Sequence, residues 1–313
     1  MLGIRPFEAT DAEPVAQLLQ ALWAHEPTMH ALYNMHRIWP TDDGRIRRTL
    51  VAAINSSVVG VGTLFESVLH PRMLMVMIHV AQAWQRQGIG SALFEALARL
   101  SDGRPWLAKL TRRDVAGMSF FAKRGFHPVL TTLSGLLELD REAVQQWISI
   151  LPRSVVGFQI LSFTDPRSTV TLSDVAHIHA AIYRQSHMWN PPVEETTDMA
   201  LAHYCGTNVI SGSQVCVYRD NELVGAGNLI TNPFQPELPE AYLVNMGVVE
   251  RDRVETDEIQ AALLRHILQR ATEQNVRVRF EIDATRSSYW SLFERAPVTE
   301  VDRDFVIVAN TDR

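Results

Sequence analysis

The stretch from Met73 to Leu100 constrains the fold of this chain more than any other. It opens with an apolar run, Met73 to Val80, which predicts a strand buried on both faces. A polar turn with two glycines follows, and residues Ser91 to Leu100 then place Leu and Phe at helical spacing. A strand, a glycine-bearing turn and a helix in direct succession present unpaired backbone N–H groups to an anion. The sequence therefore predicts that this turn binds a diphosphate.

The same stretch resembles motif A of the GNAT N-acetyltransferase superfamily, written (Gln/Arg)-x-x-Gly-x-(Gly/Ala). Here Val80 is followed five residues later by Gln85-x-x-Gly88-x-Gly90 and then by the Leu-rich helix. In that family the motif amides hold the pyrophosphate of acetyl-CoA, and glycines leave room for the ligand. The resemblance thus implies acetyl-CoA (coenzyme A) as cosubstrate. The cofactor-binding residues that we expect from this motif, and from a second motif described next, are Ile78, His79, Val80, Gln85, Arg86, Gln87, Gly88, Ile89, Gly90, Ser91 and Phe121.

A second segment, Asp114 to Phe126, resembles motif B of the family, Asn-x-x-Ala-x-x-Phe-Tyr-x-x-x-Gly-Phe. Phe120, Gly125 and Phe126 match this pattern. Asp114 stands where Asn is common, and Phe121 stands where many members have a Tyr. That tyrosine hydroxyl often protonates the departing thiolate of CoA, which phenylalanine cannot do. The thiolate then leaves unprotonated or takes its proton from water or substrate, or the domain is a slow catalyst.

The sequence does not settle which residue removes a proton from the acceptor. Alternation along the strand places the family's usual base positions at Leu74, Val76 and Ile78, which are all apolar. His79 has the opposite parity, so it acts as the base only if a bulge turns it, and is otherwise a core histidine. Glu66, near the end of the preceding strand, is the second candidate. Further candidates in segment 24–44 are His25, Glu26 and His36.

The length of 313 residues suits two domains. Residues 1–139 show the element order β-α-β-β-β-α-β-α-β, which is similar to that of a GNAT domain that binds acetyl-CoA. Residues 140–157 form a linker helix and turn, and a similar element order repeats over residues 158–313. We therefore expect an α/β (α+β) fold of two tandem GNAT-like domains. Each domain is a mixed, mostly antiparallel sheet flanked by helices.

Three more specific expectations concern strands. Phe126–Thr131 and Gly135–Leu139 are expected to form a closing strand pair of the first domain. In the second domain, Ala241–Val249 is expected to be one strand, and Val298–Val308 the last strand.

The central turn of the second domain lacks the features of the first. Thr256 and Glu258 stand where the first domain has Gly88 and Gly90, and Asp257 adds a second carboxylate. Acidic side chains suit a helix start but repel a pyrophosphate. We expect a degenerate GNAT-like domain that does not bind CoA in the family's way. It either completes the acceptor pocket or stabilises the first domain.

The composition argues against several classes of partner. A net charge of −6, with arginines scattered or in short pairs, argues against nucleic acid. No apolar run approaches the roughly 20 residues that a membrane span needs, and the first residues lack the pattern of a signal peptide. Cys205 and Cys216 have no metal-ligand spacing, so we expect no metal site and two reduced thiols in a cytoplasmic protein. The oligomeric state stays open.

Two classes of function remain. The first is an acetyl-CoA-dependent N-acetyltransferase, an acyltransferase that transfers groups other than aminoacyl groups. Its acceptor is a small-molecule amine, a metabolite or antibiotic-like compound, that attacks the thioester directly while amides near Ile78 and Val80 polarise the carbonyl. The second is a non-catalytic acyl-CoA-binding or regulatory protein, which Phe121 and the apolar strand suggest. Release of the CoA thiol with a panel of amines distinguishes the two.

Overall fold

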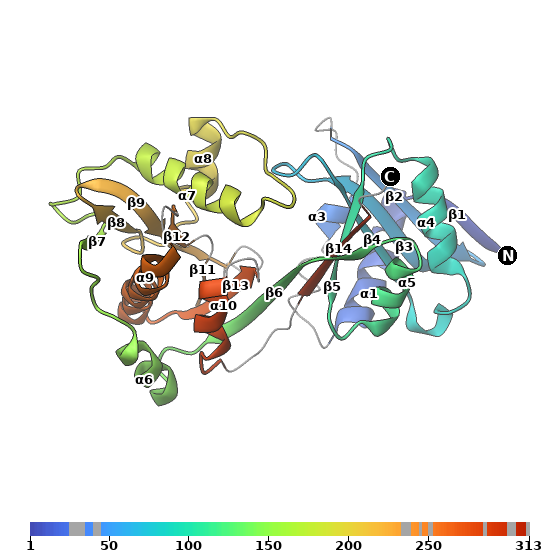
Figure 1. The fold of residues 1–313 in the computed structure, drawn as a ribbon. Helices are drawn as coiled ribbons and strands as arrows, with labels where there is room; N and C mark the ends of the chain where they lie inside the picture. The colour runs from blue at the N-terminus through green and yellow to red at the C-terminus, as the bar shows by residue number, and fades with distance from the viewer. Residues whose placement is uncertain are drawn as a thin grey trace. The chain divides into compact units, whose positions relative to one another are not determined.

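The chain forms two compact units in the computed structural model (Figure 1). Unit 1 comprises Met1–Leu110, Asp114–Val129 and Ile307–Arg313, and unit 2 comprises Thr111–Arg113 and Leu130–Val306. The structure describes residues 1–24, 35–39, 45–232, 239–243, 246–249, 253–283, 287–298 and 305–310.

The sheet of unit 1 begins with antiparallel strands that pair in chain order. These are β1 (Leu2–Pro6), β2 (Arg47–Ile54), β3 (Ser57–Glu66) and β4 (Leu74–Val80). Asn55 and Ser56 join β2 to β3 with φ angles of 48° and 67°, the positive values of a tight hairpin turn. The two strands therefore form a hairpin.

The end of the chain completes this sheet. After β4, the strand order of the sheet continues with β5 (Trp106–Thr111), β14 (Phe305–Asn310) and the start of β6 (His127–Leu137). Figure 1 shows β14, in dark red, among the strands of unit 1. Two predictions are thus wrong. Residues 127–137 form one strand instead of a closing pair, and the last strand lies in the sheet of unit 1 rather than finishing the second domain.

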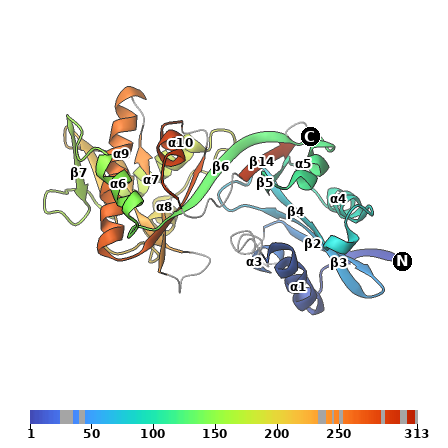
Figure 2. The same cartoon turned by 90° about the horizontal axis from the view of Figure 1, so that it is seen from below.

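Helices cover both faces of this sheet (Figure 2). On one face lies α1 (Ala12–Trp23), which follows the 3-10 turn η1 (Ala9–Asp11). On the other face lie α4 (Ile89–Arg99) and α5 (Val115–Ala122). A Cβ at Gly62 of β3 would lie 3.1 Å from Leu97 of α4, so glycine permits this close packing. The Asp114 carboxylate caps α5 by accepting the Gly117 N–H at 2.7 Å. A short helix, α3 (Met35–Ile38), precedes β2.

Unit 2 contains a four-stranded sheet between two helices. Its strand order is β12 (Gly247–Val248), β9 (Glu222–Gly227), β8 (Val215–Arg219) and β7 (Phe158–Ser162). Alternation along β8 divides its side chains. Val215 and Val217 join the core cluster that contains α9 (Arg253–Glu273), whereas Cys216 and Tyr218 pack with α7 (Leu172–Ser186).

A second group of strands in unit 2 shows where sequence patterns predict continuity that the backbone lacks. The end of β6 pairs with β13 (Arg277–Asp283), followed by β11 (Glu240–Leu243) and β10 (Leu229–Thr231). The single strand expected over Ala241–Val249 is wrong, because β11 pairs with β13 while β12 pairs with β9. Asn228 separates β9 from β10, and its side-chain amide donates to the Tyr204 carbonyl at 2.8 Å.

The stretch expected to link the domains is packed into unit 2. It contains α6 (Glu142–Ile150), and Arg265 of α9 donates to the carbonyls of Ile148, Ser149 and Leu151 at 2.6–2.8 Å. The compact units also differ from the expected domains 1–139 and 158–313. Residues 130–139 lie in unit 2 and residues 307–313 in unit 1. The remaining helices of unit 2 are α8 (Thr197–Tyr204) and α10 (Ser287–Glu294).

Within the described ranges, no helix combines the length and the apolar character that crossing a membrane requires.

Replacing Arg265 with Met should lower the free energy of unfolding by about 2–4 kcal/mol, because three carbonyls at the end of α6 lose a charged donor. Urea unfolding measures this loss. Arg270→Met is the matched control on the same helix, since it removes only an exposed ion pair with Glu273 and should cost less than about 1 kcal/mol. Equal losses in both variants would contradict the structural role of Arg265.

Candidate functional site

The two parallel strands β4 and β5 separate soon after they meet. β4 pairs with β3 along the whole length of β4, from Glu66↔Leu74 to Gly60↔Val80. The β4–β5 ladder has only two positions, Leu74↔Trp106 and Met75↔Leu107, although both strands are fully described. Beyond Val76, β4 therefore has a hydrogen-bonding edge that β5 does not cover.

The direction of the backbone groups on that edge follows from alternation. The Leu74 N–H donates to the Pro105 carbonyl at 2.9 Å, which places the Leu74 N–H on the β5 side. Because N–H groups point alternately to either side of a strand, those of Val76, Ile78 and Val80 also point to the β5 side. The Val76 N–H serves the Met75↔Leu107 position of the ladder, so the N–H groups of Ile78 and Val80 lie on the edge that the ladder leaves uncovered.

The turn after β4 is held by its own side chains. It contains a 3-10 turn, η2 (Gln82–Trp84), and Gln85 Nε2 donates to the Val80 carbonyl at 3.1 Å. Arg86 and Gly88 both have left-handed φ angles, 64° and 84°. A Cβ at Gly88 would meet no heavy atom within 4 Å, so the space beside the turn is open.

The first turn of α4 supplies further donors. The first intrahelical bond runs from the Ala92 N–H to the Gly88 carbonyl at 3.0 Å. The amides of Ile89, Gly90 and Ser91 precede it and have no acceptor within the helix. The helix dipole adds partial positive charge at this end. These features together favour an anion.

The other side chains of the turn differ in exposure. Arg86 and Gln87 are exposed, and Gln87 Nε2 donates to the Ala83 carbonyl at 3.2 Å. The side chain of Ile89 is buried. Of these predicted contact residues, only Arg86 presents an exposed charged group.

Two residues that the sequence analysis missed lie beside the start of α4. A Cβ at Gly90 would lie 3.3 Å from the Phe120 ring and 3.8 Å from Ile78 Cγ2. Arg124 stacks on Phe120, with Cζ 3.7 Å from the ring centroid, and its Nη2 donates to Ser91 Oγ at 2.7 Å. Burial lowers the pKa of Arg124 from its ordinary value, although a guanidinium stays charged in proteins. An arginine four residues after Phe120 is the signal that could have pointed to this contact.

The central part of unit 1 matches a known family model. Residues 45–128 match the model described as acetyltransferase (GNAT) domain. This range contains the separated strands, the glycine turn and Arg124. Unit 1 contains a GNAT domain. The resemblance found in motifs A and B is thereby confirmed.

Solved structures extend the GNAT fold to the whole chain. A GCN5-related N-acetyltransferase from Sphaerobacter thermophilus aligns with a TM-score of 0.66 at 13% identity, covering 98% of this chain and 95% of that one. A tandem GNAT protein from the clavulanic acid biosynthesis pathway aligns with a TM-score of 0.60 at 16% identity, covering 99% and 98%. The chain therefore has a tandem GNAT fold, as predicted. A comparison with curated proteins finds no match.

In this GNAT domain, Phe121 is part of the aromatic core. Its side chain is only 4% exposed, and its ring lies 5.2 Å from Phe120 and 4.9 Å from Phe126 between centroids. Phe120, rather than Phe121, is the ring next to Gly90. Contact between Phe121 and the cofactor therefore stays a prediction.

The bulge that would turn His79 is absent from β4, since every residue from Leu74 to Val80 pairs one-to-one with β3. The His79 ring is 8% exposed and lies against Trp23 of α1, 5.8 Å between centroids. The Ile78 side chain projects from the opposite face of the sheet, toward Gly90. Burial lowers the pKa of His79 to about 4, so its imidazole is neutral near pH 7 and a weak base.

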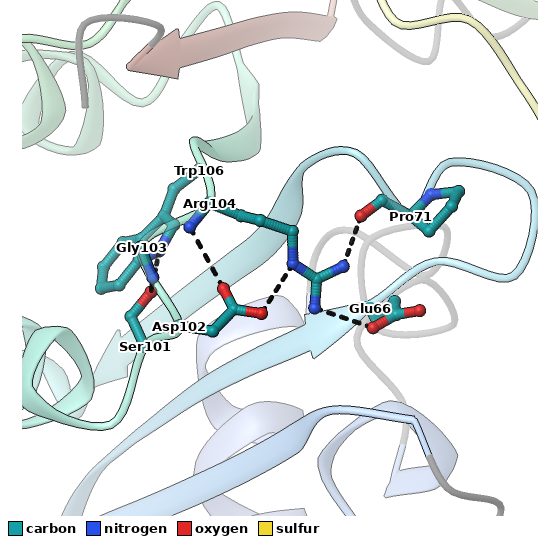
Figure 3. Close-up of polar contacts among 7 residues, drawn as sticks. All are labelled: Glu66, Pro71, Ser101, Asp102, Gly103, Arg104 and Trp106. Carbon is teal, nitrogen blue, oxygen red and sulfur yellow. Dashed lines mark hydrogen bonds and ion pairs between the residues drawn. The ribbon is translucent and has the colours of Figure 1, made fainter.

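Glu66, the last residue of β3, lies beside the start of β4, at the end remote from the glycine turn. It pairs with Leu74, which places it about 20 Å along the strand from the turn. Its Oε2 accepts from Arg104 Nη2 at 2.8 Å (Figure 3). Arg104 also forms an ion pair with Asp102 at 2.8 Å and donates to the Pro71 carbonyl. These contacts indicate that Glu66 stabilises the segment between β3 and β4.

The other candidate bases cannot be placed. His25 and Glu26 lie outside the described residues, and only the backbone of His36 is described, in α3. Across the described ranges, no three His, Cys, Asp or Glu side chains are grouped so that they could hold a metal ion. Cys205 and Cys216 are free thiols, and burial raises the pKa of both.

The corresponding corner of unit 2 is described in part, because residues 250–252 lie outside the described ranges. Thr256, Asp257 and Glu258 lie within α9, which begins at Arg253. Thr256 is buried, whereas both carboxylates are exposed. The loss of CoA binding in this domain stays a prediction.

Stability should depend on pH through His79. Its pKa is about 4 in the folded protein against an ordinary value of 6.5, so the unfolded chain binds the proton more tightly. Stability therefore rises with pH between 4 and 6.5, and falls by about 3 kcal/mol as pH drops through that window. Urea unfolding of wild type and His79→Gln at pH 4 to 7 measures this term, which the variant should lose. His127→Gln, at an exposed histidine, is the control, and equal pH dependence in all three proteins would refute the assignment.

Proposed function

We propose that this protein is an acetyl-CoA-dependent N-acetyltransferase that acts on a small-molecule amine, such as a metabolite or antibiotic-like compound. The observation that carries the proposal is the early end of the β4–β5 ladder beside a glycine turn with unpaired amides. The match of residues 45–128 to an acetyltransferase (GNAT) domain supports the same reaction. The net charge of −6 is consistent with a cationic acceptor.

The two sets of donors suit the two polar parts of acetyl-CoA. The amides of Ile89, Gly90 and Ser91 lie at the positive end of the α4 dipole, so we assign the diphosphate to the turn from Gln85 to Ser91 that contains them. The edge of β4 beyond Val76 offers N–H groups to the amide-containing pantetheine arm. The open space at Gly88 fits this assignment, because a ligand can reach the main chain there.

In the proposed reaction the neutral amine attacks the thioester carbonyl. A C–N bond forms, negative charge develops on the carbonyl oxygen, and the N–H groups of Ile78 and Val80 stabilise that charge. The C–S bond then breaks, and CoA leaves with the electron pair as a thiolate. The nitrogen loses a proton to a base or to water.

Of the candidate bases, neither His79 nor Glu66 is assigned the role here. His79 lies on β4 between Ile78 and Val80, but no bulge turns it and its ring packs against Trp23 on the face opposite Ile78. Glu66 is engaged by Arg104 at the far end of the strand, so we propose a structural role for it. We therefore propose that the proton passes to water, so the rate should follow the ionisation of the acceptor amine.

One observation favours a second function, that of a non-catalytic acyl-CoA-binding or regulatory protein. Phe121 occupies the motif B position at which the resemblance implies a proton-donating tyrosine, and its ring is buried. The discriminating experiment measures release of CoA thiol from acetyl-CoA with a panel of amines, together with CoA binding by calorimetry. Turnover supports the acetyltransferase. Binding without turnover on any amine supports the second function, and absence of binding contradicts both.

The double variant Gly88→Glu, Gly90→Glu should show no CoA binding in calorimetry, since its two carboxylates would occupy the diphosphate position and repel the diphosphate charge. Gly103→Glu is the matched control. Gly103 also has a left-handed φ, 91°, and also has no atom within 4 Å of an added Cβ, but it lies outside the turn. Unchanged affinity in the double variant would count against this site.

A further inference from the structure

Arg124 links α5 to α4 through its guanidinium. Its Nη1 donates to the Phe120 carbonyl at 2.8 Å, and its Nη2 donates to Ser91 Oγ at 2.7 Å. Its flat face lies on the Phe120 ring, with Cζ 3.7 Å from the centroid. The guanidinium is therefore held in position from α5 and contacts the first turn of α4.

The contact determines what the Ser91 hydroxyl can do. Arginine only donates hydrogen bonds, so Ser91 Oγ accepts from Arg124 and its own proton points elsewhere. Among the described residues, Ser91 Oγ has no other hydrogen-bond partner. Ser91 also belongs to the turn whose backbone amides have no acceptor within the helix. Its hydroxyl thus adds one more donor to the anion-binding end of α4.

The main chain of Arg124 is anchored as well. Its carbonyl accepts from Asn310 Nδ2 at 2.9 Å, and Asn310 is the last residue of β14. The next residue, Gly125, has a left-handed φ of 79° and lies close to the Asn310 amide, 3.5 Å from a Cβ added there. β14 therefore anchors the main chain of Arg124, whose side chain in turn bonds to Ser91.

We propose that Arg124 is a positioning residue that directs the Ser91 hydroxyl at the diphosphate of CoA. The inference rests on the proposed function, because it assumes that CoA binds at this turn. The positive charge of Arg124 adds to the helix dipole at the start of α4, and stacking on Phe120 limits the rotation of the long arginine side chain. Lysine lacks the planar fork that makes both hydrogen bonds, so Arg124→Lys should restore binding only in part.

The test compares Arg124→Met with Lys123→Met, which removes the same charge from the neighbouring exposed residue. Dissociation constants are measured for CoA, for 3′-dephospho-CoA and for pantetheine, which lacks the diphosphate. Arg124→Met should weaken CoA and 3′-dephospho-CoA by the same factor, roughly tenfold, and leave pantetheine unchanged. Lys123→Met should bind all three probes as the wild type does. Thermal melting shows whether each variant is folded.

Ser91→Ala provides a second route, useful if Arg124→Met fails to fold. It should weaken CoA binding to a similar extent, and adding Arg124→Lys to it should have little further effect, since both changes act on one hydroxyl. Additive losses would overturn the proposal, as would equal weakening of pantetheine, an effect confined to CoA with its 3′-phosphate, or equal effects of Arg124→Met and Lys123→Met. Failure of the wild-type protein to bind CoA would instead overturn the proposed function itself.

Discussion

The hydrogen-bond ladder between β4 and β5 ends at Met75, and the rest of the proposed site depends on that early end. Backbone donors that lose a strand partner need another acceptor, because an unpaired polar group removed from water costs free energy. The N–H groups of Ile78 and Val80 point to this uncovered edge, and the glycine turn that follows adds the amides of α4. A ligand with an amide-bearing arm and a diphosphate would satisfy both sets, which is why acetyl-CoA fits the chemistry of the site.

The elements that frame this edge come from distant parts of the chain. α5 contributes Phe120 and Arg124, which contact Gly90 and Ser91 at the start of α4. β14, the last strand, follows β5 in the sheet order and anchors Arg124 through Asn310. Unit 1 is therefore completed by residues that the chain reaches only after unit 2. A GNAT domain cut after residue 139 would lack this strand.

Local patterns in the sequence predicted most of what surrounds the turn. The apolar run, the two glycines and the Leu-rich stripe of α4 all lie within Met73–Leu100. The capped helix after Asp114 is likewise encoded within one short segment. Pairing between distant segments was less accessible. Nothing in residues 298–308 distinguishes a strand of unit 1 from one of unit 2, and 33 residues separate Arg124 from Ser91. The low pKa of His79 depends on its burial against Trp23, which parity alone does not reveal.

Hydrogen–deuterium exchange with and without CoA tests directly whether CoA binds at the edge of β4 and the glycine turn, because it reports on the backbone amides themselves. CoA should slow exchange at the amides of Ile78 and Val80 and of residues 85–91 in unit 1. It should leave exchange unchanged at 253–258, the corresponding corner of unit 2. Protection at 253–258 without protection at the glycine turn would contradict CoA binding at this site.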